Sequence, residues 1–223
     1  MQICDDHEDD IDAGIVKKIH DHNIYKNAKD LTEQLRPVAN AIDTCQSDKT
    51  SIADAADTWL SLAEHPALQA HKKSVDKRLN QALTAEHFTA YKLHPKYQGR
   101  RLNDKQLAIV NEFLEQRDPD NIATLIALDA QSAPFPPVYF TESAKSINPV
   151  VWWKGLKMYS VPSSFIDLAA LLLASPASSA SIERVFSSFG LIHTKVRNRL
   201  GNAKAAKLVF CYRMLRGKEE LDY

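Results

Sequence analysis

Hydrophobic residues recur along much of the chain at spacings of three and four, which is the period of an amphipathic helix. The clearest example is the series Leu31, Leu35, Val38 and Ile42. No segment alternates apolar and polar residues in the way that a half-buried strand does. The pattern therefore predicts an all-α protein, an irregular helical bundle, with helices over 11–23, 27–45, 52–63, 67–83, 84–91, 103–114, 119–128, 149–158, 163–174, 179–193 and 202–216.

Prolines divide this series of helices. Pro37 lies inside the second one, and because proline removes a backbone donor and clashes with the preceding turn, we expect a kink or a split there. The segment Ser132-Ala133-Pro134-Phe135-Pro136-Pro137 excludes a continuous helix. We therefore predict a helical domain over 1–132, a linker over 133–146 and a C-terminal region over 147–223.

The composition is that of a soluble globular protein, with 44% hydrophobic and 25% charged residues among 223. No apolar run reaches the roughly 18 residues that a membrane span needs. The residues after Met1 are acidic, unlike those of a signal peptide. Cys4 and His7 have the spacing of half a zinc site, but no second pair of ligands follows. We expect a soluble intracellular chain without a membrane partner, a disulfide framework or a metal site of its own.

The net charge of zero hides a gradient along the chain. Residues 1–12 contain six acids and no lysine or arginine, whereas residues 184–218 contain nine bases and no acid. A basic block of this kind can contact phosphates. The alternative is a solvated surface with cations near the carboxyl ends of helices, where they are favourable. Charge alone leaves both interpretations open.

The last predicted helix, 202–216, is apolar on two sides. One stripe contains Ala205, Leu208, Val209, Tyr212 and Leu215, and a second contains Ala203, Ala206, Phe210 and Met214. A helix of this kind is either deep in a core or covered by a partner. Because lysines and arginines lie between the stripes, a partner chain is the better explanation.

The preceding helix, 179–193, carries one carboxylate among small residues. Its apolar stripe is expected to face a core and comprises Ile182, Val185, Phe186, Phe189 and Ile192. Glu183 lies on another face, with Ser179, Ser187 and Gly190 at helical spacing. An acid in the first turn of a helix is favourable for electrostatic reasons alone, so this position does not by itself indicate a catalytic group.

The last third of the chain resembles a known family. The tryptophan pair before Lys154, the serine-rich block that ends in Ile182-Glu183-Arg184-Val185-Phe186-Ser187, and the basic block at 195–200 resemble, over about 147–216, the C-terminal dimerisation region of hAT-superfamily transposases. Leu35-Arg36-Pro37 and His94-Pro95-Lys96-Tyr97 are similar to the helical insertion domain of that family.

This resemblance implies an RNase H-like core, of which the C-terminal helices here would be the remnant. In such a core two aspartates and one glutamate hold two divalent metals, Mg²⁺ or Mn²⁺, for strand cleavage. The resemblance places Glu183 at the position of the glutamate, and nothing in the sequence indicates the strands that would carry the two aspartates. We therefore expect a truncated or domesticated transposase without a complete catalytic triad, needing no cofactor of its own.

The expected function is dimerisation with a second copy or a related transposase chain, in the nucleus by analogy with the family. The expected interface residues are Leu208, Phe210, Tyr212, Met214 and Leu215. One alternative is the C-terminal fragment of an active transposase, contributing Glu183 as a metal ligand. The other is a module that binds DNA or RNA through Arg184, Lys195, Arg197 and Arg199.

Overall fold

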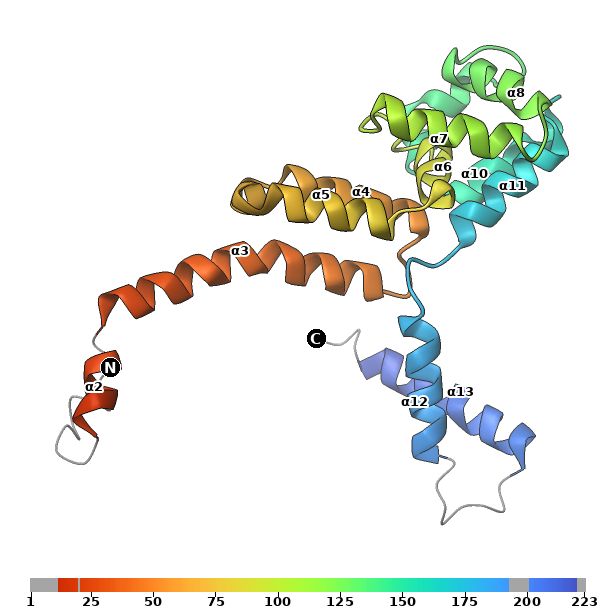
Figure 1. Cartoon of the computed structure of the whole chain (residues 1–223). Helices are drawn as coiled ribbons and strands as arrows, with labels where there is room; N and C mark the ends of the chain where they lie inside the picture. The colour runs from red at the N-terminus through yellow and green to blue at the C-terminus, as the bar shows by residue number, and fades with distance from the viewer. Residues whose placement is uncertain (1–11, 20, 193–200, 220–223) are drawn as a thin grey trace.

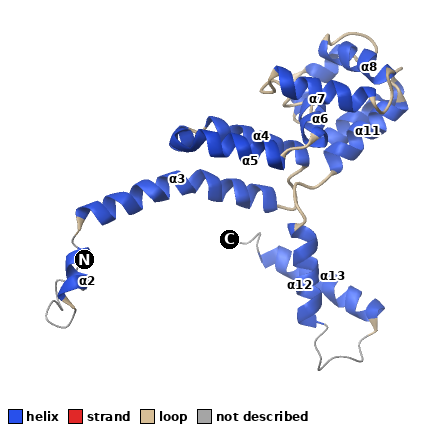
Figure 2. Ribbon diagram, viewed as in Figure 1, coloured by secondary structure: helices blue, strands red, loops and turns tan. Residues whose placement is uncertain are grey.

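The structure, a computed structural model, describes residues 12–19, 21–192 and 201–219. Every regular element in this part of the chain is a helix (Figures 1 and 2), which confirms the prediction of an all-α, irregular bundle. The elements are α2 (Ala13–Ile19), α3 (His22–Gln46), α4 (Ile52–Glu64), the 3₁₀ helix η2 (Pro66–His71), α5 (Lys72–Ala82), α6 (Ala85–Leu93), α7 (Asp104–Glu115), α8 (Asp120–Asp129), η3 (Pro137–Phe140), α9 (Glu142–Lys145), α10 (Pro149–Gly155), η4 (Leu156–Met158), α11 (Ser163–Ala174), α12 (Ala180–Ile192) and α13 (Asn202–Glu219). None of the described helices is long and apolar enough to cross a bilayer.

Short-range hydrogen bonds determine where several of these helices begin. Ser51 accepts from the backbone of Asp54 while the Asp54 carboxylate accepts from the backbone of Ser51, which is a capping box at the start of α4. Asn103 and Gln106 form the same arrangement at the start of α7. These caps satisfy backbone N–H groups that have no partner within the helix.

One hydrophobic core connects α4, α5, α6, α7, α8, α10 and α11. In Figure 1 the last five of these form the group at the upper right, and α4 and α5 lie beside each other at the centre. Its centre is Trp153, which is fully buried, contacts Phe135 and Phe165 and donates from its indole N–H to the carbonyl oxygen of Leu93 (2.9 Å). Phe135 belongs to the proline-rich segment 133–146, which was predicted to be a linker, and is only 2% exposed. The prolines exclude a long helix from this segment, but they do not prevent its side chains from entering the core.

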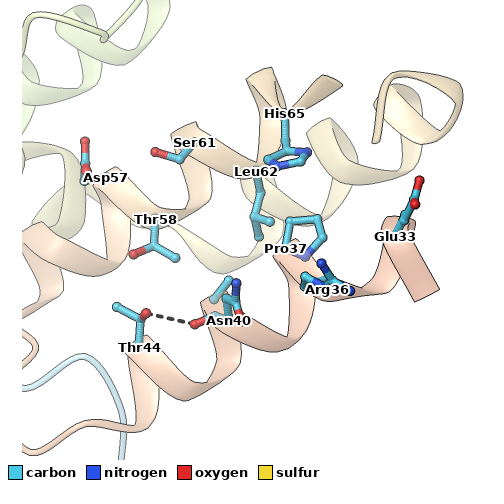
Figure 3. Close-up of a pocket in the computed structure, with 11 residues that line it drawn as sticks. Glu33, Arg36, Pro37, Asn40, Thr44, Asp57, Thr58, Ser61, Leu62 and His65 are labelled. Atoms are coloured by element: carbon cyan, nitrogen blue, oxygen red, sulfur yellow. Dashed lines mark hydrogen bonds between the residues drawn. The ribbon is translucent and has the colours of Figure 1, made fainter. Parts of the chain in front are cut away.

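Helix α3 is largely outside this core. It runs without interruption through Pro37, so the predicted split does not occur, although Figure 1 shows the helix as a shallow arch. It packs against α4, and Ala41 is its one buried residue. A groove of about 500 Å³ lies between α3 and α4, and in Figure 3 Pro37 points across it toward Leu62 and His65.

Helices α12 and α13 form a separate pair. They pack against each other, and Figure 1 shows them projecting away from the bundle, on the other side of α3 from α4 and α5. An isolated β-bridge between Ser51 and Pro176 joins the loop before α4 to the segment that leads into α12. The pair is therefore connected to the bundle near the carboxyl end of α3.

Candidate functional site

The contact between α12 and α13 covers one side of each helix. On α13, Ala205 and Val209 are buried and Tyr212 is half-buried, at spacings of four and three. On α12, the half-buried side chains include Val185 and Phe189, and no residue is fully buried. These positions form one contact line, because residues three or four apart share a helix face.

The prediction that the whole apolar stripe of α12 faces a core was wrong for two residues. Ile182 is 54% exposed and Phe186 is 69% exposed. They flank the contact line, and a single partner helix is too narrow to cover them as well. Because they were assigned to a core, neither was included among the expected interface residues.

Large apolar side chains remain uncovered on α13. Phe210 is 66% exposed and Met214 is 55% exposed, and they lie on the side of the helix away from α12. Leu208 and Leu215, seven residues apart, form a second exposed line. Lys204 and Lys207 lie between these lines and are exposed. Of the five predicted interface residues, four are therefore available to a partner, and Tyr212 lies at the contact with α12; their role in an interface stays a prediction.

The serine-rich block before α12 holds the end of α3. Ser178 donates from Oγ to the carbonyl oxygen of Cys45 (2.8 Å), and Arg184 donates to that of Gln46 (2.8 Å) and pairs with the carboxylate of Asp48. The last carbonyls of a helix have no partner within it and carry partial negative charge, so a hydroxyl and a guanidinium are suitable donors there.

Backbone hydrogen bonds reinforce the same connection. The N–H of Ile52 donates to the carbonyl of Ser175 (3.0 Å), and the N–H of Ala177 donates to the carbonyl of Thr50 (2.9 Å). We call these contacts, together with those of Ser178 and Arg184, the α3–α12 joint. Its residues are more than 120 positions apart in the sequence, so helical periodicity could not predict it.

The four basic residues proposed for nucleic-acid binding are not brought together in the described structure. Arg184 belongs to the α3–α12 joint, where its guanidinium contacts Asp48 and Gln46. Lys195, Arg197 and Arg199 lie outside the described residues. Their binding to a nucleic acid stays a prediction.

Glu183 is exposed on α12, and its carboxylate accepts a hydrogen bond from Ser179 Oγ (2.6 Å). Within residues 12–19, 21–192 and 201–219, no three His, Cys, Asp or Glu side chains are grouped so that they could hold a metal ion. A two-metal site requires several carboxylates around the pair of ions. The described residues therefore do not fit the metal pair that the resemblance implies.

The α3–α12 joint leads to a prediction about Arg184. Arg184→Gln removes the ion pair with Asp48 and weakens the bond to the Gln46 carbonyl, so we expect α12 to take a wider range of positions relative to α3. The measurement is a pulsed electron-electron distance distribution between spin labels at positions 33 and 187, with the native cysteines replaced by serine and the labelled chain diluted in unlabelled chain.

Lys157→Gln is the matched control, because it removes another exposed ion pair, with Asp167 (3.2 Å), far from the joint. Surface pairs of this kind contribute little to stability, about 0–1 kcal/mol, so both variants should stay folded. An unchanged distance distribution in Arg184→Gln would show that the backbone contacts hold the joint without the guanidinium.

A comparison with known protein families found a match in the C-terminal part of the chain. Residues 131–215 match the family described as the hAT family C-terminal dimerisation region. A search of curated proteins found no matching relative. The match includes α10 and α11 of the bundle, the serine-rich block, and α12 with most of α13. Residues 131–215 of this chain therefore match the hAT family C-terminal dimerisation region.

Proposed function

We propose that this chain is the dimerisation module of a hAT-type transposase and that α12 and α13 supply the surface through which two chains associate. The observation that carries the proposal is the exposed apolar surface of α13, which remains after α12 has covered one side of it. The partner is a second copy or a related transposase chain.

Burying this surface would offset much of the entropic cost of association. Fully burying one large apolar side chain contributes about 1.5–3 kcal/mol. Leu208, Phe210, Met214 and Leu215 are each about half exposed or more, in each of two chains. Covering all eight is of the same order as the roughly 4–15 kcal/mol that association costs in lost translational and rotational freedom. The apolar residues of α12 add to this surface.

We also propose that the module does not cut DNA by itself. The support is the position of Glu183, whose carboxylate is exposed and lies in no group of potential metal ligands within the described residues. The module acts by joining chains rather than by carrying a complete catalytic triad. Since a transposase acts on chromosomal DNA, we place this function in the nucleus.

The test of dimerisation is sedimentation velocity of the full chain. We expect a dimer at tens of micromolar for the natural sequence. In the double variant Phe210→Glu with Met214→Glu, two charges enter the surface that a partner should bury, so we expect the dissociation constant to rise at least about 100-fold. Circular dichroism checks that the variant keeps its helical content.

Ile126→Glu is the control for added negative charge at an exposed apolar site. Ile126 is 63% exposed, close to the value for Phe210, but it lies on α8 at the far side of the bundle. We expect this variant to dimerise normally. A natural chain that is monomeric at tens of micromolar, or a double variant that dimerises as the natural chain does, would contradict the proposal.

A further inference from the structure

A second uncovered apolar surface runs along α3. Its residues follow one another at intervals of four, three, four and seven, and we call them the α3 stripe: Ile24, Ala28, Leu31, Leu35 and Ile42. Alternating intervals of three and four are typical of helices that pack along another helix. All five residues are exposed, and the four large ones are each about half exposed.

The bundle does not cover this stripe. The buried Ala41 faces α4, and by helical geometry the stripe lies about a quarter of a turn around the helix from it. The groove in Figure 3 lies on the other flank of α3, where it is lined by Glu33 and Asn40 among others. The α13 of the same chain packs against α12 and leaves the stripe exposed.

The charge and the length of α13 indicate that it covers the α3 stripe. In the sequence, residues 1–12, which precede α2 and α3, contain six acids and no lysine or arginine, whereas residues 202–218 of α13 contain five bases and no acid. Such complementarity favours the approach of the C-terminal helices to the N-terminal end of α3. With a rise of about 1.5 Å per residue, both the stripe from Ile24 to Ile42 and the 18-residue α13 are about 27 Å long.

We propose that the α3 stripe of one copy receives α13 of a second copy, an inference that rests on the proposed function and names the surface on which the dimerisation helix docks. In a dimer with two-fold symmetry the contact occurs twice, because each chain offers α3 and inserts α13. These two equivalent contacts then cover the α3 stripe and the exposed apolar side of α13 in both chains. Within each chain, the α3–α12 joint holds the carboxyl end of α3 to the beginning of α12.

The first test compares two double variants of α3 in the full chain. Leu31→Lys with Leu35→Lys places cations on the stripe, opposite the basic α13, and we expect the dimer dissociation constant in sedimentation experiments to rise at least about 100-fold. Leu31→Glu with Leu35→Glu should weaken the dimer less, because Lys204 and Lys207 can pair with the new acids. An equal loss in both variants would contradict the charge complementarity from which α13 was chosen.

The control for the lysine variant is Glu33→Lys with Asn40→Lys, which adds cations to the opposite face of the same helix, and we expect an unchanged dimer. If Phe210→Glu with Met214→Glu abolishes dimerisation while the stripe variants do not affect it, the inference is overturned and the proposed function stands. If the natural chain is monomeric, both are overturned.

The second test identifies the contact directly. On a background with Cys4, Cys45 and Cys211 changed to serine, a Leu35→Cys chain is mixed with a Phe210→Cys chain and oxidised. We expect disulfide-linked dimers that contain one chain of each kind, separated by a size tag on one of them. Linkage only of position 35 to itself, or of position 210 to itself, would overturn the inference, as would the absence of linkage at concentrations where the chain is dimeric.

Discussion

Trp153→Ala is expected to lower the free energy of unfolding by about 3–5 kcal/mol, the largest effect of any single substitution considered for this chain. Trp153 is fully buried and packs against Phe135 and Phe165. Truncation removes these contacts and leaves a cavity that the surrounding helices can fill only in part. It also leaves the carbonyl of Leu93, which accepts from the indole, without that donor.

The measurement is urea unfolding followed by circular dichroism. Val151→Ala on the same helix is the control, because Val151 is 58% exposed and its truncation should change stability by less than about 0.5 kcal/mol. Trp153→Phe separates the contribution of packing from that of the indole hydrogen bond, because it keeps most of the ring and removes the donor. We expect it to lower the free energy of unfolding by less than Trp153→Ala does. A loss below about 1 kcal/mol for Trp153→Ala would show that this residue is not the centre of the core.

The second large effect is a loss of stability in mild acid that depends on His94. Burial lowers the pKa of His94 to about 4 from an ordinary value of 6.5, because the charged imidazolium is disfavoured beside Tyr97 in the core. As the pH falls from 6.5 toward 4, the unfolded chain binds a proton at this residue that the folded chain does not bind. The folded state therefore loses up to about 3 kcal/mol relative to the unfolded state over this interval.

Two other groups change the stability in the same direction. Burial also lowers the pKa of His87, which adds to the loss below pH 6.5. Burial alone would raise the pKa of Asp54, but hydrogen bonds from Ser51 and Tyr97 outweigh it and lower that pKa. The contribution of Asp54 is therefore present above its unfolded pKa of 3.8 and is lost as the pH falls further.

His94→Gln tests the assignment, because an amide oxygen can still accept from the backbone N–H of Lys96 and does not titrate. Between pH 6.5 and 4 we expect the free energy of unfolding of this variant to fall less than that of the natural chain. The difference between the two decreases should be at most about 3 kcal/mol. His71→Gln, at an exposed position, should retain the full pH dependence. An equally steep loss in His94→Gln would assign the acid sensitivity to other groups.

Local patterns in the sequence were sufficient to predict the helices and the identity of the C-terminal region. Apolar spacing predicted an all-helical chain, and the structure confirms it. The serine-rich block with Glu183 and Arg184 indicated a hAT dimerisation region, and the family match confirms that identity. Both predictions could be made from short segments of sequence, because the spacing of apolar residues and the family motif each involve residues that are close together along the chain.

The interaction surface was predicted in part. The sequence showed that α13 is apolar on two sides, but it could not show that Ala205 and Val209 pack against α12 while Phe210 and Met214 stay exposed. For the same reason Phe186 was assigned to a core. Periodicity identifies the apolar face of a helix, whereas the tertiary structure decides which part of that face is covered.

By itself, therefore, the sequence determined that the chain is helical and which faces of its helices are apolar. It also showed a resemblance to a hAT dimerisation region over about 147–216, which the family match at residues 131–215 confirms. Only the tertiary structure decided that Phe135 enters the core, that Arg184 holds the end of α3, and that the apolar faces of α3 and α13 remain uncovered. The physical reason is the range of the interactions. Helix formation depends on contacts within about four residues, whereas Arg184 and Gln46 are 138 residues apart and meet only after the bundle has formed.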